Sequence, residues 1–301
     1  MFGGSESVHI ESNPFIFWEI RIPKTITAVL AGTTLSVAGL ILQIIFRNPL
    51  AGPYVLGISS GASLFVAIAV LTGSSIGFFN NYFLGKSVII VTSVIGSVLI
   101  TLLILFLAKK INSNVILLLI GLMLSQICGA LEGALEYFAN PNDLKSFVMW
   151  GMGSLSNTSN SDLFIYLPLS FVFLSSTIFF IKPLNAFLFG QNYANNMGVN
   201  YLKSRFYLIL ISSVLTGITT AFCGPIAFVG IAVPLLSRII FKSSNQKIHL
   251  FSCMLIGSCI LLFADVICHS FSGGNILPVN MITTFIGAPL VIYLLFKNKQ
   301  W

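Results

Sequence analysis

The sequence predicts an all-α protein, a bundle of helices that cross a membrane. Of its 301 residues, 56% are hydrophobic and 8% are charged, and the mean hydropathy is +0.98. An ordinary soluble domain has about 25% charged residues. The apolar residues form runs of about 20 residues, the length that a helix needs to cross hydrocarbon. These runs are continuous rather than alternating, which favours helices over the strands of a closed barrel.

Nine apolar runs are predicted to span the membrane, within a single transmembrane domain over residues 1–301. Residues 1–20 form an external segment, and residues 186–202 form an inner connection. The run from Phe228 to Phe241 has the least defined ends, because it is short and contains Pro234. In chain order the runs are Lys24–Phe46, Tyr54–Leu71, Ser87–Ala108, Asn114–Tyr137, Leu163–Ile181, Phe206–Phe222, Phe228–Phe241, Leu250–Ser270 and Ile276–Phe296.

The charges orient these runs. If the first run leads inward, eleven of the fifteen basic residues fall on the inner side and all eight acidic residues fall on the outer side. Short cytoplasmic loops carry an excess of Lys and Arg, so the C-terminus is predicted to be cytoplasmic. The net charge of +7 reflects this topology, and no basic patch with interleaved aromatic residues predicts binding to nucleic acid.

The order of the runs suggests an inverted repeat. Four runs precede the central run Leu163–Ile181 and four follow it, in opposite orientations, as in many transporters. The stretches "GPYVLGI" (Gly52–Ile58) and "GPIAFVGI" (Gly224–Ile231) echo one another. Residues 1–20 are polar yet are predicted to lie outside, so we expect a further span upstream of Met1. A fragment that lacks this span and fails to insert is the alternative.

Two polar patterns inside the runs leave alternatives open. Gly32, Ser36 and Gly39 form a stripe that Gln43 continues, which favours either close helix contact or a polar pathway along Gln43. Glu132 and Glu136 lie one turn apart, and carboxylates in a membrane usually face a cavity or a partner. They line a translocation pathway or bond to neighbouring helix ends.

No reaction chemistry is predicted on this chain. The five cysteines lack the paired spacing of metal ligands. The stretch "GKS" (Gly85–Ser87) lacks the first glycine of a phosphate-binding loop, so any ATP is expected on a partner. The turn "RNPLAGP" (Arg47–Pro53) lies on the inner side, where its prolines end one helix and delay the next.

A family resemblance follows from five motifs in order. The stretch "RIPKTITAVLAGTTLSVAGLILQIIFRNPLAGPYVLGISSGAS" (Arg21–Ser63) resembles the hallmark region of the permease subunits of iron-siderophore and vitamin B12 ABC importers. The likeness continues through "MWGMGSL", "GPIAFVGIAVPLLSR", "GSCILLFADVICH" and "LPVNMITTFIGAPLVIYLL", which begin at Met149, Gly224, Gly257 and Leu277. The likeness covers essentially the whole chain, and only the first helix of that family has no counterpart in it.

The resemblance implies an assembly and a set of moving parts. Such permeases have ten spans, pair as homodimers around a central pathway, and sit on two cytoplasmic ATPase subunits that bind ATP. A periplasmic binding protein delivers the substrate. The implied cytoplasmic gate comprises Asn48, Pro49 and Leu50, here named the NPL turn, with Ser113 and Asn114. The connection Leu188–Asn200, here named the inner linker, resembles the coupling helices that dock on the ATPase, with Gly190, Ala194 and Gly198 as a smooth contact surface.

The resemblance also implies a docking site on the outer face. Arg21, Lys24 and His269 match positions at which the family presents basic residues to the binding protein, although the last is normally arginine. Further departures are Leu235, where histidine is usual, and Asn275, where an acid is frequent. These differences prevent naming the substrate by analogy.

The function expected from the sequence is a permease that imports a ferric siderophore across the bacterial inner membrane by alternating access. It is not expected to be an enzyme or to bind a cofactor itself. Cobalamin or haem import stays open. A stand-alone ion-coupled carrier also stays open, with Glu132, Glu136 and Asp265 as its coupling groups.

Overall fold

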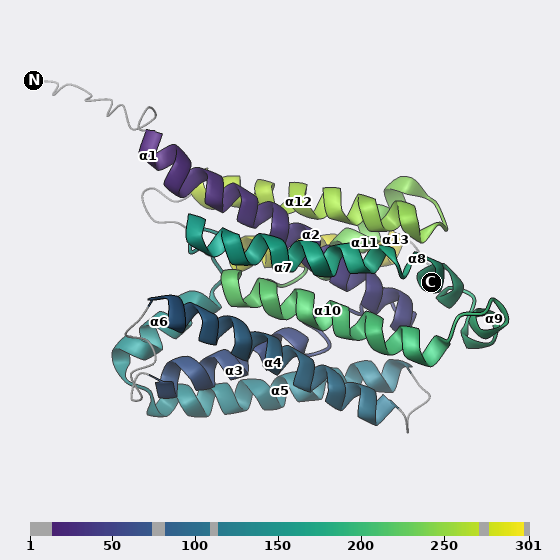
Figure 1. The fold of residues 1–301 in the computed structure, drawn as a ribbon, viewed down its shortest axis with the longest axis horizontal. Helices are drawn as coiled ribbons and strands as arrows, with labels where there is room; N and C mark the ends of the chain where they lie inside the picture. Colours follow the sequence, from purple (N-terminus) through teal and green to yellow (C-terminus); the bar gives the residue numbers. More distant parts are fainter. Residues whose placement is uncertain (1–13, 74–81, 109–113, 271–276, 298–301) are drawn as a thin grey trace, which may run out of the picture.

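A long central helix, α2 (Ile22–Phe46), organises the fold, which was obtained as a computed structural model. The structure describes residues 14–73, 82–108, 114–270 and 277–297. Most of α2 is buried, and it contacts α10 (Tyr201–Cys223), α11 (Val229–Phe241) and α12 (Gln246–Ser270). Figure 1 shows α2 running diagonally between α12 and α10.

The remaining helices surround this centre. In Figure 1, α3, α4 and α5 form a second group on the far side of α10, and α7 crosses in front of α2. At the N-terminus α1 and a short π-helix, η2, lead into α2. The bounds are Pro14–Ile16 for α1, Phe17–Arg21 for η2, Ile58–Gly73 for α3, Tyr82–Ala108 for α4, Asn114–Phe138 for α5, Pro141–Gly151 for α6, Asn160–Ile178 for α7, Ile181–Phe187 for α8, Gln191–Asn196 for α9 and Val279–Lys297 for α13.

The all-helical prediction is confirmed over the described residues. Six helices are long and apolar enough to cross a membrane: Phe17–Phe46, Gly85–Ala108, Val115–Phe138, Asn160–Ile178, Tyr201–Cys223 and Gln246–Ser270. Three shorter apolar helices, Ile58–Thr72, Val229–Phe241 and Val279–Leu294, fall on the three other predicted runs. The count of nine spans and the inverted repeat stay predictions.

Three local boundaries differ from the sequence-based expectation. The run predicted from Tyr54 becomes helical only at Ile58, because residues 53–57 form turns that end at Gly57 with φ +74°. The run predicted to Ile181 divides into α7 and α8. Helix α6 was not predicted as an element, because its 11 residues are too few and too polar to read as a span.

The glycine stripe of α2 forms close helix crossings. A Cβ atom at Gly32 would lie 2.2 Å from Gly257 O on α12, and one at Gly39 would lie 1.7 Å from Gly230 O on α11. Between them Ser36 Oγ donates to Cys253 O at 2.8 Å. Of the two alternatives for this stripe, the geometry supports close helix contact for Gly32, Ser36 and Gly39.

Buried hydroxyl groups join the helices elsewhere in the bundle. Thr34 and Thr219 bond through their hydroxyls at 2.7 Å, which links α2 to α10. Ser93 on α4 donates to Gly217 O at 2.7 Å. Hydrogen bonds of this kind between helices contribute to their association inside a membrane.

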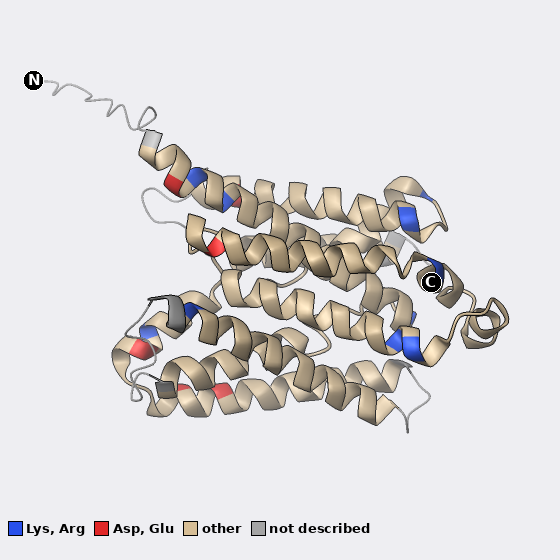
Figure 2. Ribbon diagram, in the orientation of Figure 1, with Lys and Arg blue, Asp and Glu red and all other residues tan. Residues whose placement is uncertain are grey.

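The acidic side chains gather at one end of the molecule. Figure 2 shows all the described Asp and Glu residues toward the end from which the N-terminus leaves, whereas the opposite end carries Lys and Arg only. We call the latter the acid-free end. The charges are therefore segregated as the sequence predicts, and the assignment of the acid-free end to the cytoplasm stays a prediction.

The Gly39 crossing gives the first prediction. Gly39→Ala forces α2 away from α11, because the added Cβ overlaps backbone that no side-chain rotation can move. We expect the free energy of unfolding to fall by about 1–3 kcal/mol or more, which is measured as a lower midpoint of thermal unfolding in detergent. Gly129→Ala on α5 is the control, because its Cβ meets nothing within 4 Å. Equal midpoints for the two variants would contradict the crossing.

Candidate functional site

The NPL turn is closed by its own hydrogen bonds. Helix α2 ends at Phe46, and Arg47 adopts the left-handed conformation with φ 47°. Asn48 N donates to Gln43 O at 3.2 Å, and Asn48 Oδ1 accepts from Leu50 N at 2.8 Å. The backbone N–H of Asn48 therefore closes the end of α2, and its side chain accepts a hydrogen bond from the backbone two residues later. The result is a turn of fixed shape.

Gln43 braces this turn from inside the bundle. Its side chain is 1% exposed, and Nε2 donates to Pro49 O at 2.7 Å and to Ile231 O at 3.1 Å. Oε1 has no hydrogen-bond partner among the described residues. Gln43 thus holds the turn against α11, a role that sequence reasoning did not find, and its place along a pathway stays a prediction.

A cavity of about 280 Å³ adjoins the turn. It is lined by Gln43, Ile44, Arg47, Asn48, Pro49, Leu188 and Arg238. The cavity therefore lies between the NPL turn and the start of the inner linker. Of the second predicted gate pair, Ser113 lies outside the described residues, and Asn114 is the first residue of α5.

The small residues of the inner linker differ in their exposure: Ala194 is buried, Gly190 is half-buried and Gly198 is exposed. Ala194 is completely buried. Gly190 has φ +107° and precedes α9, and Gly198 has φ +74° and follows it, so both serve the turns that bound this helix. The sequence predicted that all three residues let a partner surface approach closely. For Ala194 this prediction is wrong, because its side chain is buried and cannot contact a partner.

Several exposed residues of the inner linker are large and apolar, among exposed polar neighbours such as Gln191 and Asn192. Phe189, Tyr193 and Met197 are 65%, 43% and 48% exposed, and the rings of Phe189 and Tyr193 lie 4.8 Å apart. They recur every four residues, one position before the small residues, so the sequence held this signal. We name them the linker patch. It lies at the acid-free end, and a cluster of exposed apolar side chains is typical of an interaction surface.

Arg47 connects the turn to the linker. Its Nη2 donates to Phe187 O at 3.0 Å and to Leu188 O at 3.5 Å. A Cβ atom at Gly190 would lie 2.9 Å from the same Nη2. The absence of a side chain at Gly190 therefore leaves room for the guanidinium. The structure brings together the two regions that the sequence predicted separately.

At the opposite end two of the three predicted docking residues meet. Lys24 Nζ lies 2.8 Å from Asp265 Oδ1 and 2.8 Å from His269 Nε2, and the Lys24 side chain is 11% exposed. His269 Nδ1 lies 2.9 Å from Asp265 O, which fits the tautomer with hydrogen on Nδ1. Arg21, at the end of η2, is exposed. Lys24 is thus engaged within the chain.

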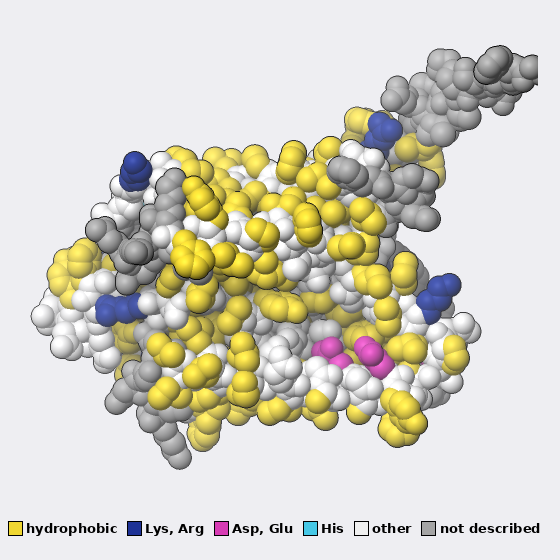
Figure 3. Space-filling model, turned by 180° about the vertical axis from the view of Figure 1, so that it is seen from behind, with side chains coloured by type: hydrophobic (Ala, Val, Ile, Leu, Met, Phe, Trp, Pro, Cys, Tyr) yellow, Lys and Arg dark blue, Asp and Glu magenta, His cyan; other side chains and the backbone are white. Residues whose placement is uncertain are grey.

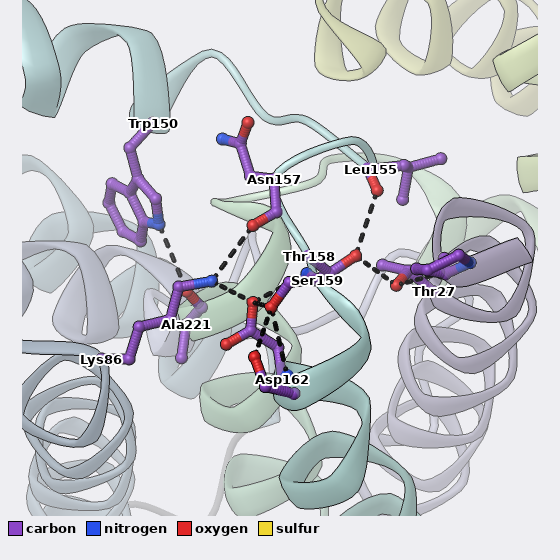
Figure 4. Close-up of polar contacts among 11 residues, drawn as sticks. Thr27, Lys86, Trp150, Leu155, Asn157, Thr158, Ser159, Asp162 and Ala221 are labelled. Atoms are coloured by element: carbon purple, nitrogen blue, oxygen red, sulfur yellow. Dashed lines mark hydrogen bonds and ion pairs between the residues drawn. The ribbon is translucent and has the colours of Figure 1, made fainter. Parts of the chain in front are cut away.

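Sequence reasoning missed a second ion pair at this end. Figure 4 shows Lys86 of α4 reaching the carboxylate of Asp162 and the carbonyl of Asn157. Asp162 also accepts from Ser159 N at 2.8 Å, which completes a capping box at the start of α7. The Asp162 side chain is 4% exposed. The pair therefore fixes α4 to the loop that precedes α7.

The segment of residues 149–162 also bonds to three further helices. In Figure 4, Trp150 Nε1 donates to Ala221 O at 3.3 Å, and Thr158 bonds Thr27 of α2 at 2.6 Å. Val279 N, at the start of α13, donates to Gly153 O at 3.2 Å. Residues 149–162 therefore tie together α2, α4, α10 and α13.

The two acids of α5 lie on a face that the chain leaves open. Glu132 and Glu136 are partly exposed, and a Cβ atom at Gly129 or Gly133 would meet nothing within 4 Å. Glu132 Oε1 is enclosed without a hydrogen-bond partner among the described residues. Figure 3 shows two neighbouring acidic side chains on the rear face, low in the view where α5 lies.

Comparison with known proteins identifies the family of this site. Residues 4–297 match the model of the FecCD transport family. The chain belongs to the FecCD transport family. It is a multi-pass membrane protein and a permease subunit of the metal-chelate, haem and vitamin B12 type of ABC importer.

Relatives carry names from several branches of the family. The chain is 32% identical to the putative ABC transporter permease protein MJ0876 of Methanocaldococcus jannaschii, over 96% of this chain and 85% of the relative. It is 32% identical to the hemin transport system permease protein HmuU of Yersinia pestis, over 95% and 84%. It is 31% identical to the vitamin B12 import system permease protein BtuC of Pectobacterium atrosepticum, over 96% and 85%.

A solved structure agrees with the fold. The inward-facing conformation of a putative metal-chelate type ABC transporter superposes with a TM-score of 0.83 and 27% identity, covering 99% of this chain and 93% of the other. PsaBC of Streptococcus pneumoniae, solved with an antibody fragment, shares the fold with a TM-score of 0.64 and 18% identity, over 93% and 92%.

The buried Lys86–Asp162 pair gives the second prediction. Lys86→Met leaves the Asp162 carboxylate enclosed without its cation, which costs about 3–5 kcal/mol for a fully buried pair and less here, since Lys86 is partly exposed. We expect a lower midpoint of thermal unfolding in detergent. Adding Asp162→Asn to Lys86→Met removes the unpaired charge and recovers part of the loss. A double variant as unstable as the sum of the two single variants would contradict this coupling.

Proposed function

We propose that this chain is the membrane-spanning subunit of a bacterial inner-membrane importer for ferric siderophores. Two copies surround the pathway, two cytoplasmic ATPase subunits hydrolyse ATP, and a periplasmic protein delivers the substrate. The chain itself catalyses no bond chemistry. In this proposal nine spans are present, the two groups of four have opposite orientation, and the C-terminus is cytoplasmic.

One observation carries the proposal: the exposed linker patch stands at the acid-free end and adjoins the NPL turn. An ATPase that grips the patch moves the linker, and the linker lies against the turn that closes the inner end of the pathway. Alternating access then follows from rocking of helices around fixed crossings such as Gly32 with Gly257. A protein that needs no ATPase has no use for an apolar patch at this position.

The identity of the substrate has weaker support than the role of the chain as a permease. Relatives named for iron chelatin and hemin are compatible with an iron complex, others are named for vitamin B12, and haem and cobalamin are therefore the alternatives within the family. The acids of α5 favour a substrate with positive charge, because an ionised carboxylate beside a pathway attracts cations and repels anions.

Reconstitution tests the proposal against a stand-alone carrier. Liposomes that contain the chain, a cognate ATPase and a loaded binding protein should take up the ferric siderophore when ATP is supplied. An ion gradient without ATP should drive no uptake. Uptake by the chain alone under a gradient, lost in the variants Glu132→Gln, Glu136→Gln and Asp265→Asn, would instead support the carrier. Running cobalamin and haemin in parallel assigns the ligand.

The linker patch gives the third prediction. Tyr193→Ala removes an exposed ring at the proposed ATPase contact, and truncation of an interface aromatic typically costs about 2 kcal/mol or more. We therefore expect about 30-fold weaker association with the ATPase, measured by co-purification over a titration. Phe164→Ala, at an 83% exposed ring on α7, is the control and should leave association unchanged. Equal loss in both variants would count against the patch.

The acids of α5 give the fourth prediction. Glu132→Gln combined with Glu136→Gln keeps the shape of the face and removes its charge. We expect uptake of cationic ferric complexes to fall about tenfold relative to anionic complexes, the effect of about 1.4 kcal/mol. Asp143→Asn, which removes a half-buried acid on α6, is the control. Unchanged uptake of every substrate would show that these acids do not face the pathway.

A further inference from the structure

We propose that Arg47 transmits movement of the inner linker to the NPL turn, and is therefore a positioning residue for the inner gate. This inference rests on the proposed function, because it assigns the path by which ATPase movement reaches that gate. It adds a residue that neither the gate nor the linker motif contains: Arg47 precedes the NPL turn and lies about 140 residues from the linker in sequence.

The contacts of Arg47 run in both directions. Along the chain, Arg47 lies between the last residue of α2 and Asn48, and Arg47 N donates to Ile44 O at 3.3 Å. Across space, Nη2 donates to Phe187 O at 3.0 Å and to Leu188 O at 3.5 Å. Phe187 O also accepts from Gly190 N at 3.3 Å. The guanidinium therefore holds the junction between α8 and α9.

The junction is built to turn at this point. Gly190 has φ +107°, which side chains rarely adopt, and it separates α8 from α9. Before it Phe187 is anchored in the core, at 1% exposure, whereas the linker patch is exposed, with Phe189 just before Gly190 and Tyr193 and Met197 after it. A force applied to the patch therefore acts at the Gly190 junction, and Arg47 is bonded to that junction.

The cavity of about 280 Å³ gives the turn room to respond. Asn48 and Pro49 line it from the turn, and Leu188 lines it from the linker. Close contact would resist any relative movement, because protein interiors are dense. Here the charge-assisted hydrogen bond of Arg47 spans the edge of an open space, so the turn can follow the linker without a clash.

A second helix end shows what the arginine side chain adds. Lys242 ends α11 with φ 44° and ψ 35°, nearly the values of 47° and 42° at Arg47. Lys242 is exposed, and it follows Arg238, which lines the cavity beside the NPL turn, by one helical turn. The left-handed backbone alone therefore serves to end a helix, and the bond to the linker is the additional property of Arg47. Lys242 is the matched control for any variant of Arg47.

The test compares Arg47→Met, Arg47→Lys and Lys242→Met in the reconstituted complex with its ATPase and loaded binding protein. Methionine keeps an unbranched stem of similar reach and removes every donor, whereas lysine keeps one charged donor. Three quantities are measured: the amount of assembled complex, the rate of ATP hydrolysis and the rate of uptake. The ratio of uptake to hydrolysis is the readout that a merely structural role would not move.

We expect Arg47→Met to assemble and to hydrolyse ATP within about twofold of the parent, while uptake per ATP falls about tenfold, the effect of losing a charge-assisted hydrogen bond of about 1.4 kcal/mol. Arg47→Lys should recover part of the ratio, and Lys242→Met should leave it unchanged. An unchanged ratio in Arg47→Met overturns the inference, whether or not less complex assembles. If the parent chain itself fails to bind any ATPase, the proposed function fails instead.

Discussion

The close approach of α2 to its neighbours is the constraint on which the rest of the structure depends. Lipid tails are as apolar as leucine, so burial of apolar surface does not drive helices together inside a membrane. Dispersion and hydrogen bonds must do so, and both need short distances. The backbone contacts of Gly32 with Gly257 and of Gly39 with Gly230 provide them, and Ser36 bonds across the same seam.

The contacts of α2 with α11 and α12 determine the positions of both functional ends. Because α2 is held along its length, its last residue carries Arg47 and the NPL turn to a defined place beside α8 and α11. Its first turn carries Lys24 to α12, where Asp265 and His269 meet it. The outer loop of residues 149–162 then secures α4, α10 and α13 around the same centre. One rigid helix thus links the two faces of the permease.

The sequence predicted the helices, the polarity of the two ends and the family, because each rests on local patterns: apolar length, the placement of Lys and Arg, and contiguous motifs. It predicted three small residues of the inner linker as one contact surface, and the structure corrects this for Ala194, which is completely buried. A four-residue repeat of Gly190, Ala194 and Gly198 is equally compatible with facing a partner and with facing the core, and only tertiary contacts decide between them.

The contacts that sequence reasoning missed have one property in common. Gln43 reaches Ile231, Arg47 reaches Phe187, and Lys86 reaches Asp162, so each joins residues far apart in the chain. In two of the three the acceptor is a backbone carbonyl, which every residue has. No pattern of residue types can predict a backbone carbonyl as a partner. The pair of Lys86 and Asp162 could have been suspected, because both are charged residues next to apolar runs.

The ion pair of Lys24 with Asp265 changes what docking at the outer face would involve. A carboxylate on an arriving protein meets an ammonium that already has an anionic neighbour, so attachment there is an exchange of one counter-charge for another. An exchange yields little net free energy, although the field of nearby basic groups still guides the approach. A carrier that must let go after each delivery benefits from such a shallow hold.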